Sequence, residues 1–221
     1  MGPRPLSDDE QATVDAFHHV FYERMEDGRR STLDLIWLGY RVVKCPFDLW
    51  AYQEIVVETR PTLIVECGTK FGGTSLFLAS MFDLLGGRGR VLTIDIEPQP
   101  NLPVHPRIEY VVGSTVDPEV IARVHRAAAG QRTMVILDSG HYEPHVSAEL
   151  RAYHDIVTPG CYLIVEDTNV NGHPVLPDFG PGPMEAVDGF LATTSRFVVD
   201  RDRERFMISL NPRGYLRRVR D

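Results

Sequence analysis

The stretch Glu66-Cys-Gly-Thr-Lys-Phe-Gly-Gly-Thr-Ser75 decides how this chain folds. The apolar run Leu63–Cys67 leads into it and a helical pattern begins near Gly73, so the stretch predicts a strand, a glycine-rich loop and a helix. Glycines at positions 68, 72 and 73 let the backbone turn tightly and approach a ligand that a Cβ atom would exclude. The first N–H groups of a helix are free to donate hydrogen bonds. The stretch therefore predicts a ligand site at the end of a strand.

Downstream of this unit, short apolar runs alternate with amphipathic segments, which indicates a mostly parallel sheet flanked by helices. Helices are expected to begin near Gly73, Asp117, Glu143 and Pro183. Strands are expected at Leu63–Cys67, 91–95, Ile108–Val112, 134–138, 162–166, Phe197–Val199 and 205–210, the last two as an antiparallel hairpin. A seven-stranded, mostly parallel α/β sheet with an antiparallel last strand is the Rossmann-like layout of class I methyltransferases, in which ligands bind at the carboxyl ends of the strands.

The residues before the sheet are predicted to form a helical N-terminal extension or lid over residues 1–60, followed by a class I methyltransferase domain over residues 61–221. Ser7-Asp-Asp-Glu10 has the form of a helix capping box, and a second helix is expected from Asp48 to Glu58. At the other end of the chain, four arginines are expected to form a solvated tail: Arg213, Arg217, Arg218 and Arg220.

Composition excludes several classes of function. A net charge of -8 argues against a nucleic-acid partner, because phosphate binding needs a basic surface. Cys45, Cys67 and Cys161 are widely spaced without a C-x-x-C pair, which predicts neither a disulfide framework nor a zinc site and fits a cytoplasmic protein. No apolar run is long enough to span a membrane. The apolar N-terminal helices are expected to pack between subunits of a homo-oligomer.

The glycine-rich loop differs from a dinucleotide-binding fingerprint. Its pattern is E-x-G-x-x-x-G-G rather than G-x-G-x-x-G, and its acid, Glu66, suits the ammonium group of S-adenosylmethionine (SAM) better than a pyrophosphate. Asp95, at the end of the second strand, is placed to accept hydrogen bonds from ribose hydroxyls, and Ser114 to line an adenine pocket. Each residue alone is also explained by tight packing or turn capping, but the glycines, Glu66 and Asp95 together favour a bound cofactor.

Acidic residues follow two further strands. Asp138 ends the fourth expected strand, and Glu166 and Asp167 end the fifth. Carboxylates that converge at one edge of a sheet repel one another, and a hard cation such as Mg²⁺ or Mn²⁺ relieves the repulsion. His141 lies three residues beyond Asp138 and is a candidate proton acceptor. The alternatives are helix caps for the aspartates, a salt bridge for Glu166 and a loop position for His141.

Five segments resemble the cephalosporin hydroxylase family of class I methyltransferases, found in bacterial antibiotic and sugar-modifying pathways. They are Lys44-Cys-Pro-Phe-Asp-Leu-Trp-Ala-Tyr-Gln-Glu54, Glu66-Cys-Gly-Thr with Gly72-Gly73, Leu137-Asp-Ser-Gly-His141, Val165-Glu-Asp-Thr-Asn-Val-Asn-Gly172 and Phe179-Gly-Pro-Gly-Pro-Met-Glu-Ala186. The resemblance implies a SAM-dependent O-methyltransferase with a divalent metal. It also implies a SAM site that includes the glycine loop and Asp95, a metal held by three acids, and His141 as the base.

The candidate residues are Glu66, Gly68, Thr69, Gly72, Ser75, Asp95 and Ser114 for SAM, Asp138, Glu166 and Asp167 for the metal, and His141 with Asp138 for catalysis. Of the SAM residues, the resemblance implies Glu66, Gly68, Ser75 and Asp95. The expected substrate is a hydroxyl group of a small molecule, a sugar or an antibiotic intermediate of secondary metabolism. Three alternatives stay open at this point. They are an N-methyltransferase of an amino sugar or antibiotic, an NAD(P)-dependent hydroxylase, and a non-catalytic subunit with the SAM-binding fold.

Overall fold

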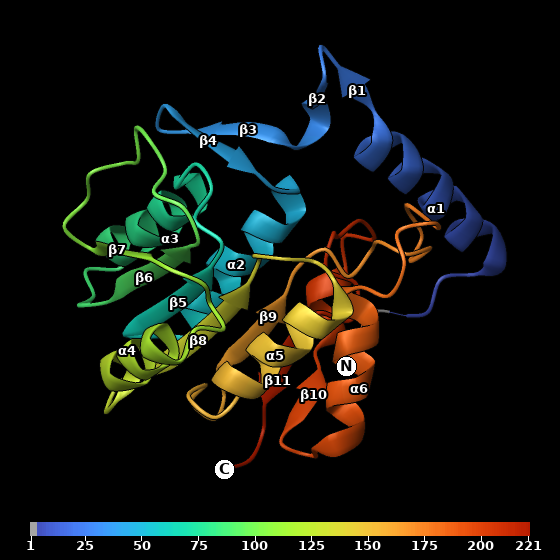
Figure 1. The fold of residues 1–221 in the computed structure, drawn as a ribbon. Coiled ribbons are helices and arrows are strands. Elements are labelled where there is room, and N and C mark those ends of the chain that lie inside the picture. Colours follow the sequence, from blue (N-terminus) through green and yellow to red (C-terminus); the bar gives the residue numbers. More distant parts are fainter. Residues whose placement is uncertain (1–3) are drawn as a thin grey trace.

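Seven strands form the central sheet of the protein, and the other elements surround it (Figure 1). The structure is a computed structural model that describes residues 4–221, with the backbone alone for residues 29–31. The first elements are α1 (Asp8–Glu23), β1 (Met25–Glu26), β2 (Arg29–Arg30), the 3-10 helix η1 (Ser31–Leu33), β3 (Asp34–Trp37), β4 (Tyr40–Val43) and α2 (Pro46–Thr59). They are followed by β5 (Leu63–Cys67), α3 (Gly73–Leu84), β6 (Arg90–Asp95), β7 (Ile108–Val112), α4 (Pro118–Ala128), β8 (Thr133–Leu137), α5 (Glu143–Tyr153), β9 (Tyr162–Val165), α6 (Pro183–Thr193), β10 (Phe197–Val199), η2 (Arg201–Glu204) and β11 (Tyr215–Arg218).

The strand order of the sheet is β10-β11-β9-β8-β5-β6-β7. The pairs formed among β9, β8, β5, β6 and β7 are parallel, and β11 runs antiparallel to both of its neighbours. Every residue of β5, β8 and β9 is buried, as expected for parallel strands covered on both faces, and this explains their nearly continuous apolar sequences. The predicted class I methyltransferase layout with an antiparallel last strand is confirmed.

Helices cover both faces of the sheet. In Figure 1, α4, α5 and α6 lie in front of the sheet, whereas α2 and α3 pack against each other behind it. The helices α3, α4, α5 and α6 begin at or next to the residues predicted from the sequence. Among the described residues, no helix is both long and apolar enough to cross a membrane.

The last strand does not lie where the sequence analysis placed it. The prediction of a strand at residues 205–210 is wrong, because the Asp48 carboxylate accepts hydrogen bonds from the Ser209 hydroxyl (2.6 Å) and from the Leu210 N–H (2.9 Å), which fixes this segment without strand pairing. The strand is β11, within the basic tail that was expected to be solvated. Arg218 of this strand is 8% exposed and donates hydrogen bonds to the backbone carbonyl of Asp155 (2.7 Å) and to that of Val157.

The N-terminal segment contains the two predicted helices and additional strands between them. Ser7 and Glu10 form the predicted capping box of α1, with Glu10 N–H donating to Ser7 Oγ (3.3 Å) and Ser7 N–H donating to Glu10 Oε2 (2.9 Å). The hairpin β3–β4 packs on α3 and was not predicted. The division of the chain at residue 60 stays a prediction, and residues 1–3 of the expected extension lie outside the described residues.

Two glycines in helices allow a matched test of how tightly the hairpin packs on α3. A Cβ atom at Gly73 would lie 2.2 Å from the Arg41 carbonyl oxygen, whereas one at Gly189 would meet nothing within 4 Å. We expect Gly73→Ala to lower the free energy of unfolding by about 1–3 kcal/mol because of this overlap. Gly189→Ala, in the exposed face of α6, should raise it by about 0.5–1 kcal/mol because alanine favours a helix. Urea unfolding of both variants checks the opposite signs, and equal shifts would contradict the packing described.

Candidate active site

The loops after β5 and β8 meet at the centre of the sheet edge. Cys67 and Leu137 are partners at the ends of these neighbouring strands, and the Asp138 N–H donates a hydrogen bond to the Cys67 carbonyl oxygen (2.8 Å). Gly68 has a φ of +103°, and a Cβ atom there would lie 1.9 Å from the Asp138 carbonyl oxygen. Only glycine fits this contact. The glycine-rich loop and the loop that carries Asp138 therefore lie against each other.

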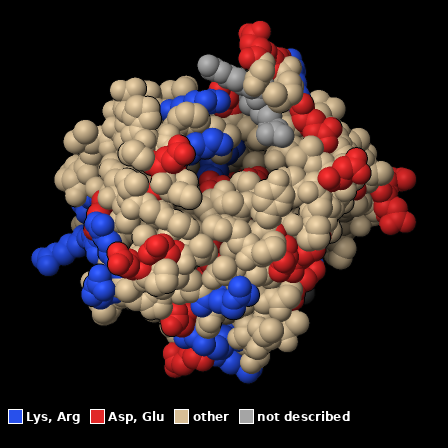
Figure 2. Space-filling model, viewed as in Figure 1, with Lys and Arg blue, Asp and Glu red and all other residues tan. Residues whose placement is uncertain are grey.

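A cavity of about 900 Å³ opens at these loops and is lined by residues from the N-terminal elements and from the strand ends. Figure 2 shows the molecule hollowed on this side, with basic and acidic side chains at the hollow. Three of the predicted cofactor residues, Gly68, Asp95 and Ser114, line the cavity. The Asp95 carboxylate accepts a hydrogen bond from the Lys70 N–H (2.8 Å), which ties the glycine-rich loop to the end of β6.

Four other predicted cofactor residues are absent from the described lining of the cavity: Glu66, Thr69, Gly72 and Ser75. The Glu66 side chain is 1% exposed and accepts hydrogen bonds from Ser75 Oγ and from Thr93 Oγ1 (2.6 Å). Thr69 Oγ1 also contacts Thr93 Oγ1 (2.7 Å). In this structure Glu66 therefore supports the loop from below, and its direct contact with a cofactor stays a prediction.

Burial governs the acidity of Glu66. Desolvation raises the pKa of its carboxyl group to about 7, and the hydrogen bonds from the Ser75 and Thr93 hydroxyls oppose this rise only in part. Near neutral pH the Glu66 carboxyl group is therefore present in both its charged and its neutral form.

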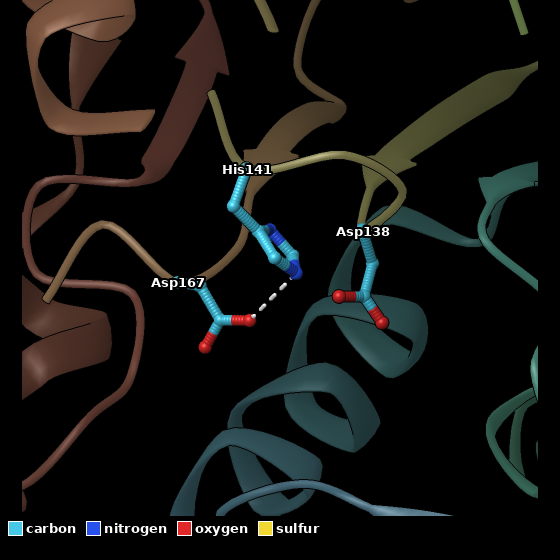
Figure 3. A group of neighbouring side chains, drawn as sticks. All are labelled: Asp138, His141 and Asp167. Atoms are coloured by element: carbon cyan, nitrogen blue, oxygen red, sulfur yellow. Dashed lines mark ion pairs between the residues drawn. The ribbon is translucent and has the colours of Figure 1, made fainter. Parts of the chain in front are cut away.

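Asp138, His141 and Asp167 converge in front of the sheet edge (Figure 3). One ligand atom from each residue lies within 4.8 Å of the others, and His141 Nε2 is 3.2 Å from Asp167 Oδ2. All three side chains are partly exposed, so the group is open to the cavity. Two carboxylates and an imidazole at this spacing suit a divalent cation. The structure thus brings together two of the three predicted metal ligands and the predicted base.

Glu166, the third predicted ligand, lies deeper and faces different partners. Its Oε2 atom is 2.5 Å from the Lys44 ammonium, and its Oε1 atom accepts a hydrogen bond from the Tyr52 hydroxyl (2.6 Å). Lys44 also forms an ion pair with Asp138. Burial raises the pKa of Glu166 well above its ordinary value, the charge of Asp138 adds to the rise, and Lys44 opposes it. The role of Glu166 as a metal ligand stays a prediction.

Residues that no motif assignment had singled out hold these acids in place. Asn211 is fully buried, its Nδ2 atom donates to the Tyr52 hydroxyl (3.3 Å), and its Oδ1 atom accepts from the Asp167 N–H (3.1 Å). Lys44 and Tyr52 belong to the family-like segment that runs from Lys44 into α2, and no sequence pattern gave either residue a role of its own. One signal could have marked Lys44, because the chain has only two lysines and this one stands among apolar residues.

The loop that carries Asp138 is anchored to α5. Ser139 Oγ donates a hydrogen bond to Glu149 Oε1 (2.6 Å), and Ser139 Oγ is also 3.0 Å from His145 Nε2. Glu149 is fully buried and raises the pKa of His145 through a hydrogen bond. The hydrogen bond between Ser139 and Glu149 therefore sets the position of the loop. Sequence spacing alone does not reveal that these two residues are paired.

The strand order, the glycine-rich loop after β5 and the acids at the ends of β8 and β9 define a class I methyltransferase. A profile of the family described as Rhamnosyl O-methyltransferase/CmcI matches residues 29–219. The chain belongs to this family, and it is an enzyme that transfers a methyl group to oxygen.

Relatives and solved structures agree with this assignment. The rhamnosyl O-methyltransferase of Mycobacterium tuberculosis (strain ATCC 25618 / H37Rv) is 33% identical over 212 residues, which cover 93% of this chain and 84% of the relative. A CmcI structure with Mg and SAM has a TM-score of 0.65 at 20% identity and covers 99% of this chain and 87% of its own. A structure of MycE, from the mycinamycin biosynthetic pathway, contains Mg, SAH and mycinamycin VI. It has a TM-score of 0.50 at 25% identity, and the match covers 64% of this chain and 40% of MycE.

The raised pKa of Glu66 predicts a pH dependence of stability. Between the ordinary pKa of 4.5 and the folded value of about 7, the folded protein holds a proton that the unfolded chain has lost. The stability contribution of Glu66 therefore falls as pH rises through this window and is constant above it. We expect Glu66→Gln to exceed the wild type in free energy of unfolding by about 1–3 kcal/mol at pH 8.

This excess should shrink as pH falls from 7 towards 4.5. Urea unfolding at several pH values checks it, with Glu119→Gln, an exposed acid in the first turn of α4, as the matched control. Parallel pH curves for the wild type and Glu66→Gln would contradict the burial argument.

Proposed function

We propose that the chain transfers the methyl group of SAM to a hydroxyl group of a sugar carried by a small molecule, with Mg²⁺ bound at the strand ends. The observation that carries the proposal is the convergence of Asp138, His141 and Asp167 beside the glycine-rich loop in one cavity. The relatives named as rhamnosyl O-methyltransferases, and the CmcI and MycE structures with Mg and SAM or SAH, support the donor, the metal and the sugar class.

The residues present fit both groups. Carboxylate oxygens suit a hard divalent cation, and Asp138, Glu166 and Asp167 are the residues that would hold it. Gly68, Asp95 and Ser114 line the cavity where SAM would lie, next to the N-terminus of α3. SAM supplies an electrophilic methyl group, and Mg²⁺ supplies positive charge that lowers the pKa of the acceptor hydroxyl.

The protein side chains orient the acceptor and remove its proton. His141 lines the cavity, and its Nε2 atom is 3.2 Å from Asp167 Oδ2, so its other ring nitrogen would be free to take the proton of the acceptor hydroxyl. Asp167 stabilises the imidazolium that results. Asp95 lines the same cavity and would accept hydrogen bonds from the ribose hydroxyls of the cofactor. Holding donor and acceptor together in one cavity supplies much of the rate.

The cavity has an aromatic wall that suits the apolar face of a sugar ring. Phe179 lines the cavity and stacks on Tyr142, with ring centroids 5.2 Å apart and an interplanar angle of 16°. Asn171 Oδ1 accepts a hydrogen bond from the Gly180 N–H (3.1 Å), which holds the Phe179 segment. Aromatic rings of this kind present a large, rigid apolar surface.

A homo-oligomeric state and a cytoplasmic location, expected from the sequence, stay predictions.

Removal of the metal or of its ligands tests the metal part of the proposal. EDTA should abolish methyl transfer and added Mg²⁺ should restore it. Asp138→Asn and Asp167→Asn should each lower kcat by at least about 100-fold because each loses a charged ligand. Transfer of the methyl group from labelled SAM to a rhamnosyl acceptor gives the measurement. The control is Asp155→Asn, an exposed acid outside the cavity. Full activity in EDTA would refute the metal site.

Substitution of His141 separates a base from a metal ligand. His141→Ala should lower kcat by about 10²–10⁴-fold through loss of general-base catalysis. Its affinity for Mn²⁺, measured by calorimetry, should stay near that of the wild type, because the three carboxylates remain. His173→Ala is the matched control, a histidine paired with Glu185 (2.9 Å) outside the cavity. Loss of Mn²⁺ binding in His141→Ala would make this histidine a ligand and not the base.

A further inference from the structure

Lys44 brings a positive charge to the strand ends, between two of the acids. It lies between β4 and α2, and its side chain is only 3% exposed. Its Nζ atom is 2.5 Å from Glu166 Oε2 and also forms an ion pair with Asp138 Oδ2. Taking an ammonium group out of water is costly unless acidic partners compensate for it. The protein itself thus supplies a cation to acids that are predicted to bind a metal.

The same short segment engages both oxygens of Glu166. Lys44 contacts Oε2, and Tyr52, in the second turn of α2, donates its hydroxyl hydrogen to Oε1 (2.6 Å). Asp138, in contrast, belongs to two groups at once, because it pairs with Lys44 and also lies in the cluster with His141 and Asp167 (Figure 3). Asp138 is therefore shared between the ammonium and the metal position.

The charges of the site add up in a simple way. When ionised, Asp138, Glu166 and Asp167 carry three negative charges, and Lys44 reduces the sum to two. One divalent cation then makes the site neutral. Without Lys44 the same cation would leave one negative charge uncompensated and would be attracted more strongly. Two cations that share one carboxylate repel each other at these distances, the more so in a partly dry site.

We propose that Lys44 is a tethered cation that competes with the divalent metal for Asp138 and Glu166 and thereby sets the metal affinity of the site. The proposal rests on the metal site of the proposed function. In the metal-free protein Lys44 holds the two acids together. In the metal-bound protein it balances the third carboxylate and keeps binding weak enough for exchange.

Lys44→Met tests the proposal, because methionine has a similar shape and no charge. Titration of the full chain with Mn²⁺ by calorimetry should give a Kd at least about tenfold lower than that of the wild type. The metal-free variant should melt about 5 °C or more below the wild type, because it leaves two acids without their partner, and saturating Mn²⁺ should recover most of this loss. Both readouts are independent of turnover.

Two variants control for charge and place. Lys44→Arg keeps the positive charge and should keep the Mn²⁺ Kd of the wild type within about threefold. Lys70→Met removes the other lysine that lines the same cavity, which is paired with neither acid in the described structure, and should likewise change Kd by less than about threefold. Should Lys44→Met be unfolded without metal, Lys44→Gln, which keeps a donor for the acids, is titrated in its place.

The outcomes separate this proposal from the proposed function. Tighter Mn²⁺ binding on loss of the Lys44 charge, with no change in Lys44→Arg or Lys70→Met, supports competition. Equal or weaker binding in Lys44→Met and Lys44→Gln overturns it and leaves the metal site standing. A wild-type protein that binds SAM and no Mn²⁺ overturns the metal site itself, and with it the role of Lys44.

Discussion

Asp138 and Glu166 follow two neighbouring parallel strands, and positive charge between their carboxylates lowers the cost of holding both at one edge of the sheet. Lys44 meets this need. It reaches the site from the segment before α2, so the N-terminal elements complete the charge balance of the sheet as well as covering it. Tyr52 and Asn211 add the hydrogen bonds that hold Glu166 and Asp167. Acids contributed by strands thus depend on partners from distant parts of the chain.

Much of the fold could be predicted because its signals are local. Buried parallel strands such as β5 and β8 are apolar runs, and turn and capping residues mark where helices begin, as Ser7 and Gly73 do. The segment at 205–210 has the apolar residues of a strand, yet its backbone is held by the buried side chain of Asp48, which no local pattern reveals. β11 was not predicted because its arginines are typical of a solvated tail, although the strand lies within the sheet.

The candidate site could be predicted in part. The family, the methyltransferase fold and the enzyme class are confirmed, since motifs at strand ends carry them. Asp138, His141 and Asp167 lie together as strand-end spacing implied, and Gly68, Asp95 and Ser114 line one cavity. The sequence does not show that the Glu66 side chain is buried against Ser75 and Thr93, because an acid at this position can face either the cavity or the protein interior. It could not pair Lys44 with Asp138 across ninety-four positions either, because that contact exists only in the folded chain.

The placement of β11 links the completion of the sheet to the support of the catalytic acids. It follows both β9 and β10 in the sequence, yet it lies inside the sheet, between them. Until it is inserted, β10 has no partner and β9 has an unpaired edge, which exposes backbone groups that attract other chains. Asn211, which orients Tyr52 and Asp167, enters with the same segment. The segment that completes the sheet therefore also supports the catalytic acids, and loss of this segment would remove both contributions.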